Sequence, residues 1–164
     1  MILKRPVLID LAALVGFLLL SFSAAAIGSA ATIPNLSPWY AELRKPPWTP
    51  PSSLFGPVWT VLYIMMSVAA WLVWRQRRAH PEDVRRALGC FLFQLGLNSA
   101  WSWMFFGLHQ TGLAFSEILA LWLMIAATIL TFAKVSRTAA LLMSPYLLWV
   151  SFAAVLNGAI HRLN

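Results

Sequence analysis

The sequence predicts an all-α membrane protein, folded as a five-transmembrane-helix bundle. The chain of 164 residues is 60% hydrophobic and only 10% charged, whereas soluble domains have about 25% charged residues. It also contains five apolar runs of about 20 residues, the length that a helix needs to cross the hydrocarbon core of a bilayer. These runs occupy most of the chain, so we expect a single membrane domain over residues 1–164.

The expected helices cover residues 7–28, 54–77, 84–107, 111–133 and 138–161, and a long loop covers residues 29–53. The first run has a basic start and small residues at its end, as a cleaved signal peptide also has. However, Asp10 interrupts the apolar stretch, and the run is long for a signal peptide. We therefore expect it to remain as the first helix.

The long loop contains an unusual proline-rich segment, "LRKPPWTPP", at residues 43–51. Proline lacks an N–H group and disfavours helix in the residue before it, so this segment is neither a helix nor a paired strand. Trp48 lies among the prolines and provides an aromatic contact. A stiff segment of this kind serves either as a lid that loses little entropy on closing or as a fixed cap over helix ends. The sequence leaves both possibilities open.

The net charge of +7 reflects topology rather than nucleic-acid binding. If the five runs alternate in direction, nine basic residues fall on the side of the N-terminus and three on the other side. Cytoplasmic loops carry the excess of Lys and Arg in membrane proteins. This pattern predicts a cytoplasmic N-terminus and an external proline-rich loop, and it favours an inner membrane over an outer one.

Three of the expected helices carry aromatic and polar residues at helical spacing on one face. These faces contain Trp59 and Tyr63; Gln94, Asn98 and Trp101; and Tyr146, Trp149 and Ala153. Amide side chains in a membrane helix need a partner that lipid cannot provide, so Gln94 and Asn98 should point into the bundle. Asn98 could simply join two helices. The convergence of aromatic walls with a few polar groups instead suggests a pocket for a flat apolar ligand.

Conventional catalytic chemistry is not visible in the sequence. We predict no catalytic residues and no metal site, because no nucleophile–base pair, metal-ligand spacing or phosphate-binding loop stands out. Glu117, about six residues inside the fourth run, is the one unusual acidic residue. Either a functional role or a structural role in the bundle interior would explain it.

Four local patterns, in order along the chain, resemble the translocator protein / tryptophan-rich sensory protein (TspO/MBR) family. They are "WYAELRKPPWTPP", "GPVWTVLY", "NSAWSWMFFG" and "PYLLW" followed by an alanine and "LN". Each pattern alone is weak, but the ordered set is specific and covers essentially the whole chain. The resemblance implies a five-helix bundle with a long first loop.

The resemblance also implies a pocket between the helices and under the first loop. The pocket residues that carry over are Trp39, Tyr40, Trp59, Tyr63, Asn98, Trp101, Trp149 and Ala153. Possible further contributors are Trp48, Gln94, Glu117 and Tyr146. The family often forms homodimers through small residues a turn apart on the third helix, but this chain has Phe93 one turn after Gly89. That interface lacks its second small residue.

The function implied is a receptor or transporter-like membrane protein that binds porphyrins (tetrapyrroles) and similar flat hydrophobic ligands, with a regulatory or sensory role. Protoporphyrin IX or a haem-like porphyrin would be the ligand, and no cofactor would be required. One alternative is an enzyme that degrades porphyrins in light. A second alternative is a structural membrane partner protein without a small ligand. In each case the partners would include membrane lipid and no nucleic acid.

Overall fold

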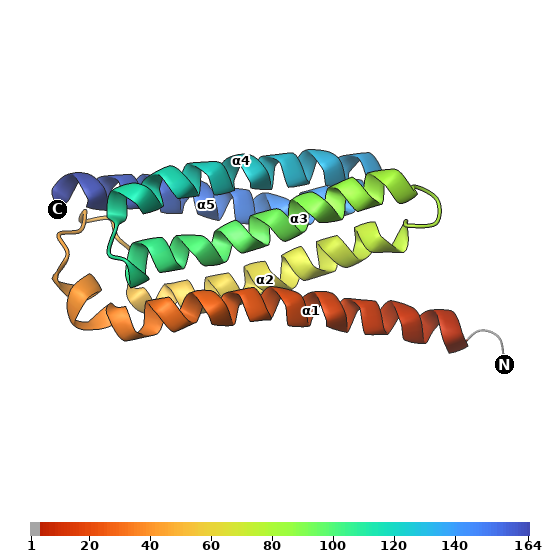
Figure 1. The fold of residues 1–164 in the computed structure, drawn as a ribbon, viewed down its shortest axis with the longest axis horizontal. Helices are drawn as coiled ribbons and strands as arrows, with labels where there is room; N and C mark the ends of the chain where they lie inside the picture. Colours follow the sequence, from red (N-terminus) through yellow and green to blue (C-terminus); the bar gives the residue numbers. More distant parts are fainter. Residues whose placement is uncertain (1–3) are drawn as a thin grey trace.

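The computed structural model describes residues 4–164, which form a bundle of five long helices (Figure 1). They are α1 (Lys4–Thr32), α2 (Ser52–Arg75), α3 (Pro81–Ser102), α4 (Thr111–Val135) and α5 (Arg137–Leu163). No strand occurs within these residues. The predicted all-α class is confirmed, and the helix bounds differ from the expected ones by two to five residues at most ends.

The helices alternate in direction, as the charge pattern requires. The N-terminal end of α1, the α2–α3 turn and the α4–α5 junction lie at one end of the bundle, on the right in Figure 1. The long loop, the α3–α4 connection and the C-terminus lie at the other end, which we call the loop end. The nine basic residues are therefore grouped away from the loop end, and the remaining three lie close to it.

The chain is an integral membrane protein by the length and composition of its helices. The residues from α1 to Tyr40, and helices α2, α4 and α5, are each long and apolar enough to cross a bilayer. Helix α3 is less apolar because its first turns contain Glu82, Asp83, Arg85 and Arg86. It also carries buried polar residues deeper in the bundle, where it packs against α1, α2 and α4.

Much of the segment expected as a loop, residues 29–53, is helical in the structure. Residues 29–32 continue α1, which is followed by a 3-10 turn at Ile33–Asn35 and a π-helical turn at Leu36–Tyr40. Pro34 and Pro38 interrupt regular α-helix here, because proline cannot donate to the preceding turn. A kink at Ser37, whose backbone is extended, interrupts these turns, and the longest stretch without helix is residues 43–51, the proline-rich segment.

The pair α4 and α5 packs closely because glycine brings the two helices together. A side chain at Gly158 would meet the ring of Phe115 at 2.9 Å, and one at Gly112 would meet the ring of His161 at 2.8 Å. The indole of Trp122 also donates a hydrogen bond to the Ser151 hydroxyl at 2.8 Å. Small residues at helix contacts are the usual means of close packing in membranes. This rigid pair forms one side of the bundle, against which α2 and α3 pack.

Candidate functional site

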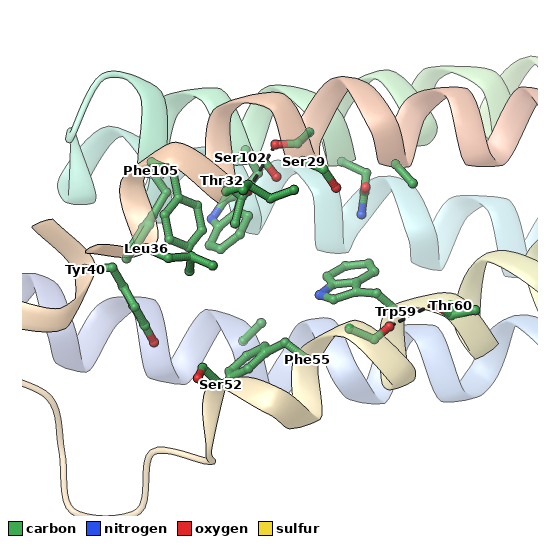
Figure 2. A pocket seen from close by; sticks show the side chains of 18 of the residues that line it. Ser29, Thr32, Leu36, Tyr40, Ser52, Phe55, Trp59, Thr60, Ser102 and Phe105 are labelled. Carbon is green, nitrogen blue, oxygen red and sulfur yellow. Dashed lines mark hydrogen bonds between the residues drawn. The ribbon is translucent and has the colours of Figure 1, made fainter. Parts of the chain in front are cut away.

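A cavity of about 700 Å³ lies inside the loop-end half of the bundle. It is bounded by α1, α2, α3 and α5, together with the turns that follow α1 and α3 (Figure 2). Ligand sites typically measure about 300–1,000 Å³, so this space is large enough for a sizeable organic molecule.

The floor of the cavity is a chain of three polar side chains from three helices. The Tyr63 hydroxyl of α2 donates a hydrogen bond to Asn98 Oδ1 of α3. Asn98 Nδ2 donates in turn to the Tyr146 hydroxyl oxygen of α5 at 2.9 Å. All three side chains are buried, with exposures of 7%, 5% and 1%. A buried amide needs such partners, and here both its acceptor and its donor atoms have one.

Aromatic rings form much of the wall. Trp101 stacks on Phe105, with 5.2 Å between ring centroids, and its indole donates to Asn157 Oδ1 at 3.0 Å. Across the cavity, Trp59 lies 5.7 Å from the ring of Tyr63. Figure 2 shows Trp59 and Phe55 on the α2 side and Phe105 on the opposite side. Hydrogen bonds and ring contacts hold these rings in place, so the walls are largely preformed.

The polar groups of the lining are almost all uncharged hydroxyls and amides. Hydroxyl groups come from Ser29, Thr32, Ser52, Ser53, Thr60 and Ser102. The described lining contains no Asp, Glu, Lys, Arg or His. An isolated charge placed deep in this space would lose its hydration without gaining a counter-ion, which is costly. The cavity therefore favours apolar or neutral ligand groups.

Six of the eight residues predicted as ligand-binding line this cavity. They are Tyr40, Trp59, Tyr63, Asn98, Trp101 and Ala153. The other two, Trp39 and Trp149, lie behind the wall. Trp39 stacks on His109 at 4.1 Å, and Trp149 packs against Phe55 at 5.7 Å.

The four possible contributors lie outside the lining. Tyr146 is the third member of the hydrogen-bonded floor but does not itself line the cavity. Trp48, in the proline-rich segment, packs against Phe152 with 6.0 Å between ring centroids. Gln94 and Glu117 are buried, with 0% and 8% exposure, and their polar side-chain atoms have no hydrogen-bond partner within residues 4–164. The burial of Gln94 agrees with the expectation that it points into the bundle, and Glu117, for which the sequence leaves a functional and a structural role open, is buried as well.

Sequence reasoning missed the contribution of α1. The lining includes Phe22, Ala25, Ala26, Gly28, Ser29, Thr32, Ile33 and Leu36. No aromatic stripe marks this wall, because small and hydroxyl residues dominate it. The serine and threonine near the end of the apolar run were the available signal, but they fell in or next to the segment expected to be a loop.

The proline-rich segment is fastened at its N-terminal start, through Arg44 and Lys45. The Asn164 side chain accepts a hydrogen bond from Arg44 N and donates one to Arg44 O, each at 3.0 Å. The Lys45 ammonium donates to the carbonyl oxygens of Tyr40, Ala41 and Leu43. This ammonium also lies 4.6 Å from the centroid of the Tyr40 ring, which lines the cavity. These contacts fix the start of the segment to the C-terminus and to the turn that carries Tyr40.

No metal centre is found among residues 4–164, since no group of three or more His, Cys, Asp and Glu residues is placed to hold an ion. The site is a cavity with aromatic walls, an amide at its floor and serine and threonine hydroxyl groups from three helices, α1, α2 and α3. This arrangement is suited to binding a flat apolar molecule.

Comparisons with known proteins agree on one family. The sequence profile of the TspO/MBR family matches residues 17–163. The chain is 43% identical to a tryptophan-rich protein TspO of Chlorobaculum tepidum over 141 residues, which cover 84% of this chain and 86% of that protein. It is 38% identical to a tryptophan-rich sensory protein of Cereibacter sphaeroides over 149 residues, or 90% and 91% of the two chains. It is also 43% identical to the translocator protein of Ovis aries over 119 residues, which cover 73% of this chain and 70% of that protein.

Proposed function

Because the chain belongs to the TspO/MBR family, we propose that it is a membrane receptor for porphyrins and similar flat hydrophobic molecules, with a regulatory or sensory role. The names of its relatives, translocator and tryptophan-rich sensory protein, support a role in sensing or moving a small molecule. Porphyrin itself, as protoporphyrin IX or a haem-like molecule, is our proposal for the ligand.

The observation that carries this proposal is the aromatic cavity. Trp59 of α2 and Trp101 of α3 provide broad flat surfaces in the wall of one cavity of about 700 Å³. Aromatic faces stack favourably on a conjugated macrocycle, and the buried area of such a ligand supplies most of its affinity. Asn98 at the floor and the hydroxyl groups along α1 and α2 provide the few polar contacts that orient a ligand.

We further propose that the loop end faces outward from a bacterial inner membrane and that the N-terminal end faces the cytoplasm. The grouping of nine basic residues away from the loop end supports this orientation. In that orientation, a ligand reaches the cavity from the outer half of the bilayer or from the external face.

A protoporphyrin IX titration of detergent-purified protein, in the dark and without oxygen, tests the proposal. We expect saturable quenching of tryptophan fluorescence because Trp59 and Trp101 line the cavity. Trp59→Phe should reduce the quenching amplitude. Trp74→Phe, a matched control near the far end of α2 where Arg77 stacks on the indole at 3.3 Å, should leave the ligand affinity unchanged.

Illumination of the complex in air then separates binding from degradation. Porphyrin that is bound and bleached no faster than free porphyrin supports a receptor. A defined product that forms faster than from free porphyrin would instead support the photochemical enzyme. Absence of saturable quenching in the wild type would refute the proposed function. The remaining alternative would then be a structural membrane protein that binds a partner and no small ligand.

A further inference from the structure

Basic residues gather at the end of the bundle opposite the loop, in the first turns of α3 and at the junction of α4 and α5 (Figure 1). The cavity does not reach this end, because none of its lining residues lies in these segments. Nine of the twelve Lys and Arg residues, but only three of the five acidic residues, are on this side. Membrane topology explains why the cations lie on one side of the bilayer. It leaves open which of them are neutralised within the protein and which are not.

The cations on the α1/α2 side of this end have partners within the protein. Arg75 pairs with the Asp10 carboxylate at 3.2 Å, and its guanidinium lies 4.9 Å from the centroid of the Trp71 ring. The Arg77 guanidinium lies 3.3 Å from the centroid of the Trp74 ring and donates to the Trp74 carbonyl oxygen. These two cations are thus committed to a carboxylate, to aromatic faces and to a helix end.

Three other basic residues, Arg86, Lys134 and Arg137, have no such partners, and we call them the basic patch. All three are exposed, and neither ion pair found among the side chains that the structure describes includes any of them. The patch lies on the side of the bundle formed by α3, α4 and α5. The free positive charge is therefore concentrated on one side of this end.

The packing of α3 on α4 brings the patch together. Phe91 of α3 stacks on Phe132 of α4 with 6.2 Å between ring centroids. Arg86 comes five residues before Phe91, and Lys134 comes two residues after Phe132, so both lie beyond this contact toward the same end. Since a helix rises about 1.5 Å per residue, each is within about 8 Å of the stacked rings along the helix axis. Arg137 begins α5, after the single residue that separates it from α4.

The patch lies where the apolar spans of α4 and α5 end. Leu130, one turn before Lys134, is 67% exposed, and Leu141, one turn after Arg137, is 71% exposed. Apolar side chains with this exposure contact the acyl chains of the bilayer, whereas basic side chains at a span end extend toward the headgroups. The free cations are thus placed at the depth of lipid phosphates, with lipid-contacting leucines one turn away.

The positive charge of the patch is not balanced by nearby carboxylates. Helix α5 has no acidic residue in its first turn, and the helix dipole there adds positive potential around Arg137. Glu82 and Asp83 lie in the first turn of α3, where the dipole favours carboxylates. Glu82 already pairs with Arg85 at 2.7 Å, and Asp83 forms no ion pair with Arg86 within the described side chains. An anion from outside the protein would therefore lower the energy of the patch.

We propose that the basic patch binds the headgroup of an anionic phospholipid from the leaflet at this end of the bundle. Guanidinium groups form paired, charge-assisted hydrogen bonds with phosphate, and clusters of basic residues beside membrane helices recognise anionic lipids. A lipid fits better than a soluble phosphate because Leu130 and Leu141 offer contacts to its acyl chains. The inference is independent of the proposed function, since the patch and the cavity lie in opposite halves of the bundle.

Native mass spectrometry of detergent-purified protein tests the site, with phosphatidylglycerol and phosphatidylcholine that have the same acyl chains. We expect the wild type to bind phosphatidylglycerol at least about tenfold more tightly. The double variant Arg86→Gln, Arg137→Gln should reduce this preference to about threefold or less. Both residues are exposed and glutamine suits a helix, so the melting temperature in detergent should not change. The matched control Arg44→Gln, Arg162→Gln removes the same charge from exposed positions near the loop end and should keep the full preference.

The results that would overturn the inference are distinct. A wild-type preference below about twofold would show that the patch selects no anionic lipid. Equal losses in the two glutamine variants would show that net charge matters and that this location does not. Glycerophosphoglycerol, the headgroup without acyl chains, should not displace phosphatidylglycerol at the same concentration. Displacement would show that the patch takes a soluble phosphate, and the lipid assignment would be wrong.

Discussion

Replacing Asn98 by Leu should destabilise the fold through its two tyrosine partners. The substitution keeps the side-chain volume roughly constant and removes both hydrogen bonds of the cavity floor. Tyr63 lies at the edge of the cavity, where its hydroxyl can find water or ligand. Tyr146 is 1% exposed and has no such access. The Tyr146 hydroxyl should therefore account for most of the cost.

The size of the effect follows from two measured scales. Leaving a buried hydroxyl without a partner costs about 1–3 kcal/mol in soluble proteins. Hydrogen bonds between membrane helices average about 0.6 kcal/mol and reach about 1.7 kcal/mol, because the unfolded state also finds partners. The lower scale applies inside a bundle of this kind. We expect Asn98→Leu to lower the free energy of unfolding by about 1–2 kcal/mol.

A double-mutant cycle with Tyr146→Phe isolates the buried pair. Tyr146→Phe alone should cost about 1 kcal/mol by removing the acceptor of Asn98 Nδ2. In the Asn98→Leu background it should cost little, since the orphaned hydroxyl disappears with it. The two changes should thus be non-additive by about 1 kcal/mol, measured by SDS titration of purified protein. As a control, Trp122→Phe removes a separate bond to Ser151 and should add its effect independently. Additive losses for Asn98 and Tyr146 would refute the floor as a connected chain.

Two further predictions concern the cavity and the topology. Ala153→Leu places about three more heavy atoms against the cavity and should reduce protoporphyrin IX affinity several-fold, a loss of about 1 kcal/mol or more. The control Val155→Leu, on the exposed face of the same helix, should leave the affinity unchanged. Equal affinities in the wild type and both variants would show that Ala153 is not part of the site. In a Cys90→Ser background, an impermeant thiol reagent added to intact spheroplasts should label a cysteine at Ser53 and spare one at Arg78, and the reverse pattern would invert the proposed orientation.

The sequence predicted the helices and most of the aromatic wall because both depend on simple spacing. Membrane helices must be about 20 apolar residues long, and residues three and four apart share a face. This logic correctly grouped Asn98 with Trp101 and placed both at one cavity. Trp149, one turn from Ala153 on α5, is not among the residues that line the cavity. Its ring packs edge-on against Phe55 of α2 at 5.7 Å, and contacts between helices cannot be read from the spacing within one helix.

The wall formed by α1 could not be predicted for a related reason. Helix α1 is apolar on all sides, so periodicity gives no direction for its inner face. Its orientation depends on individual contacts, such as the close approach of Gly28 to Ser102. Glycine, alanine and serine are so common in membrane helices that a contact of this kind has no distinctive pattern.

The position of the cavity indicates whether a ligand can cross the whole bundle, as in a channel, or only bind in one half of it, as in a receptor. Below the Tyr63–Asn98–Tyr146 floor, the bundle interior is filled by Met66, Val73, Phe91, Phe132 and Met143, each 0% exposed. A macrocycle could pass to the other end only if these side chains lost their packing contacts together, and such interiors resist expansion because they are as dense as organic crystals. The contacts of Asp10 with Trp71 and Arg75 also close the α1/α2 seam there. A ligand that enters the cavity in the loop-end half must therefore leave from that half, and this geometry favours reversible binding, as a receptor requires, over continuous passage through the bundle.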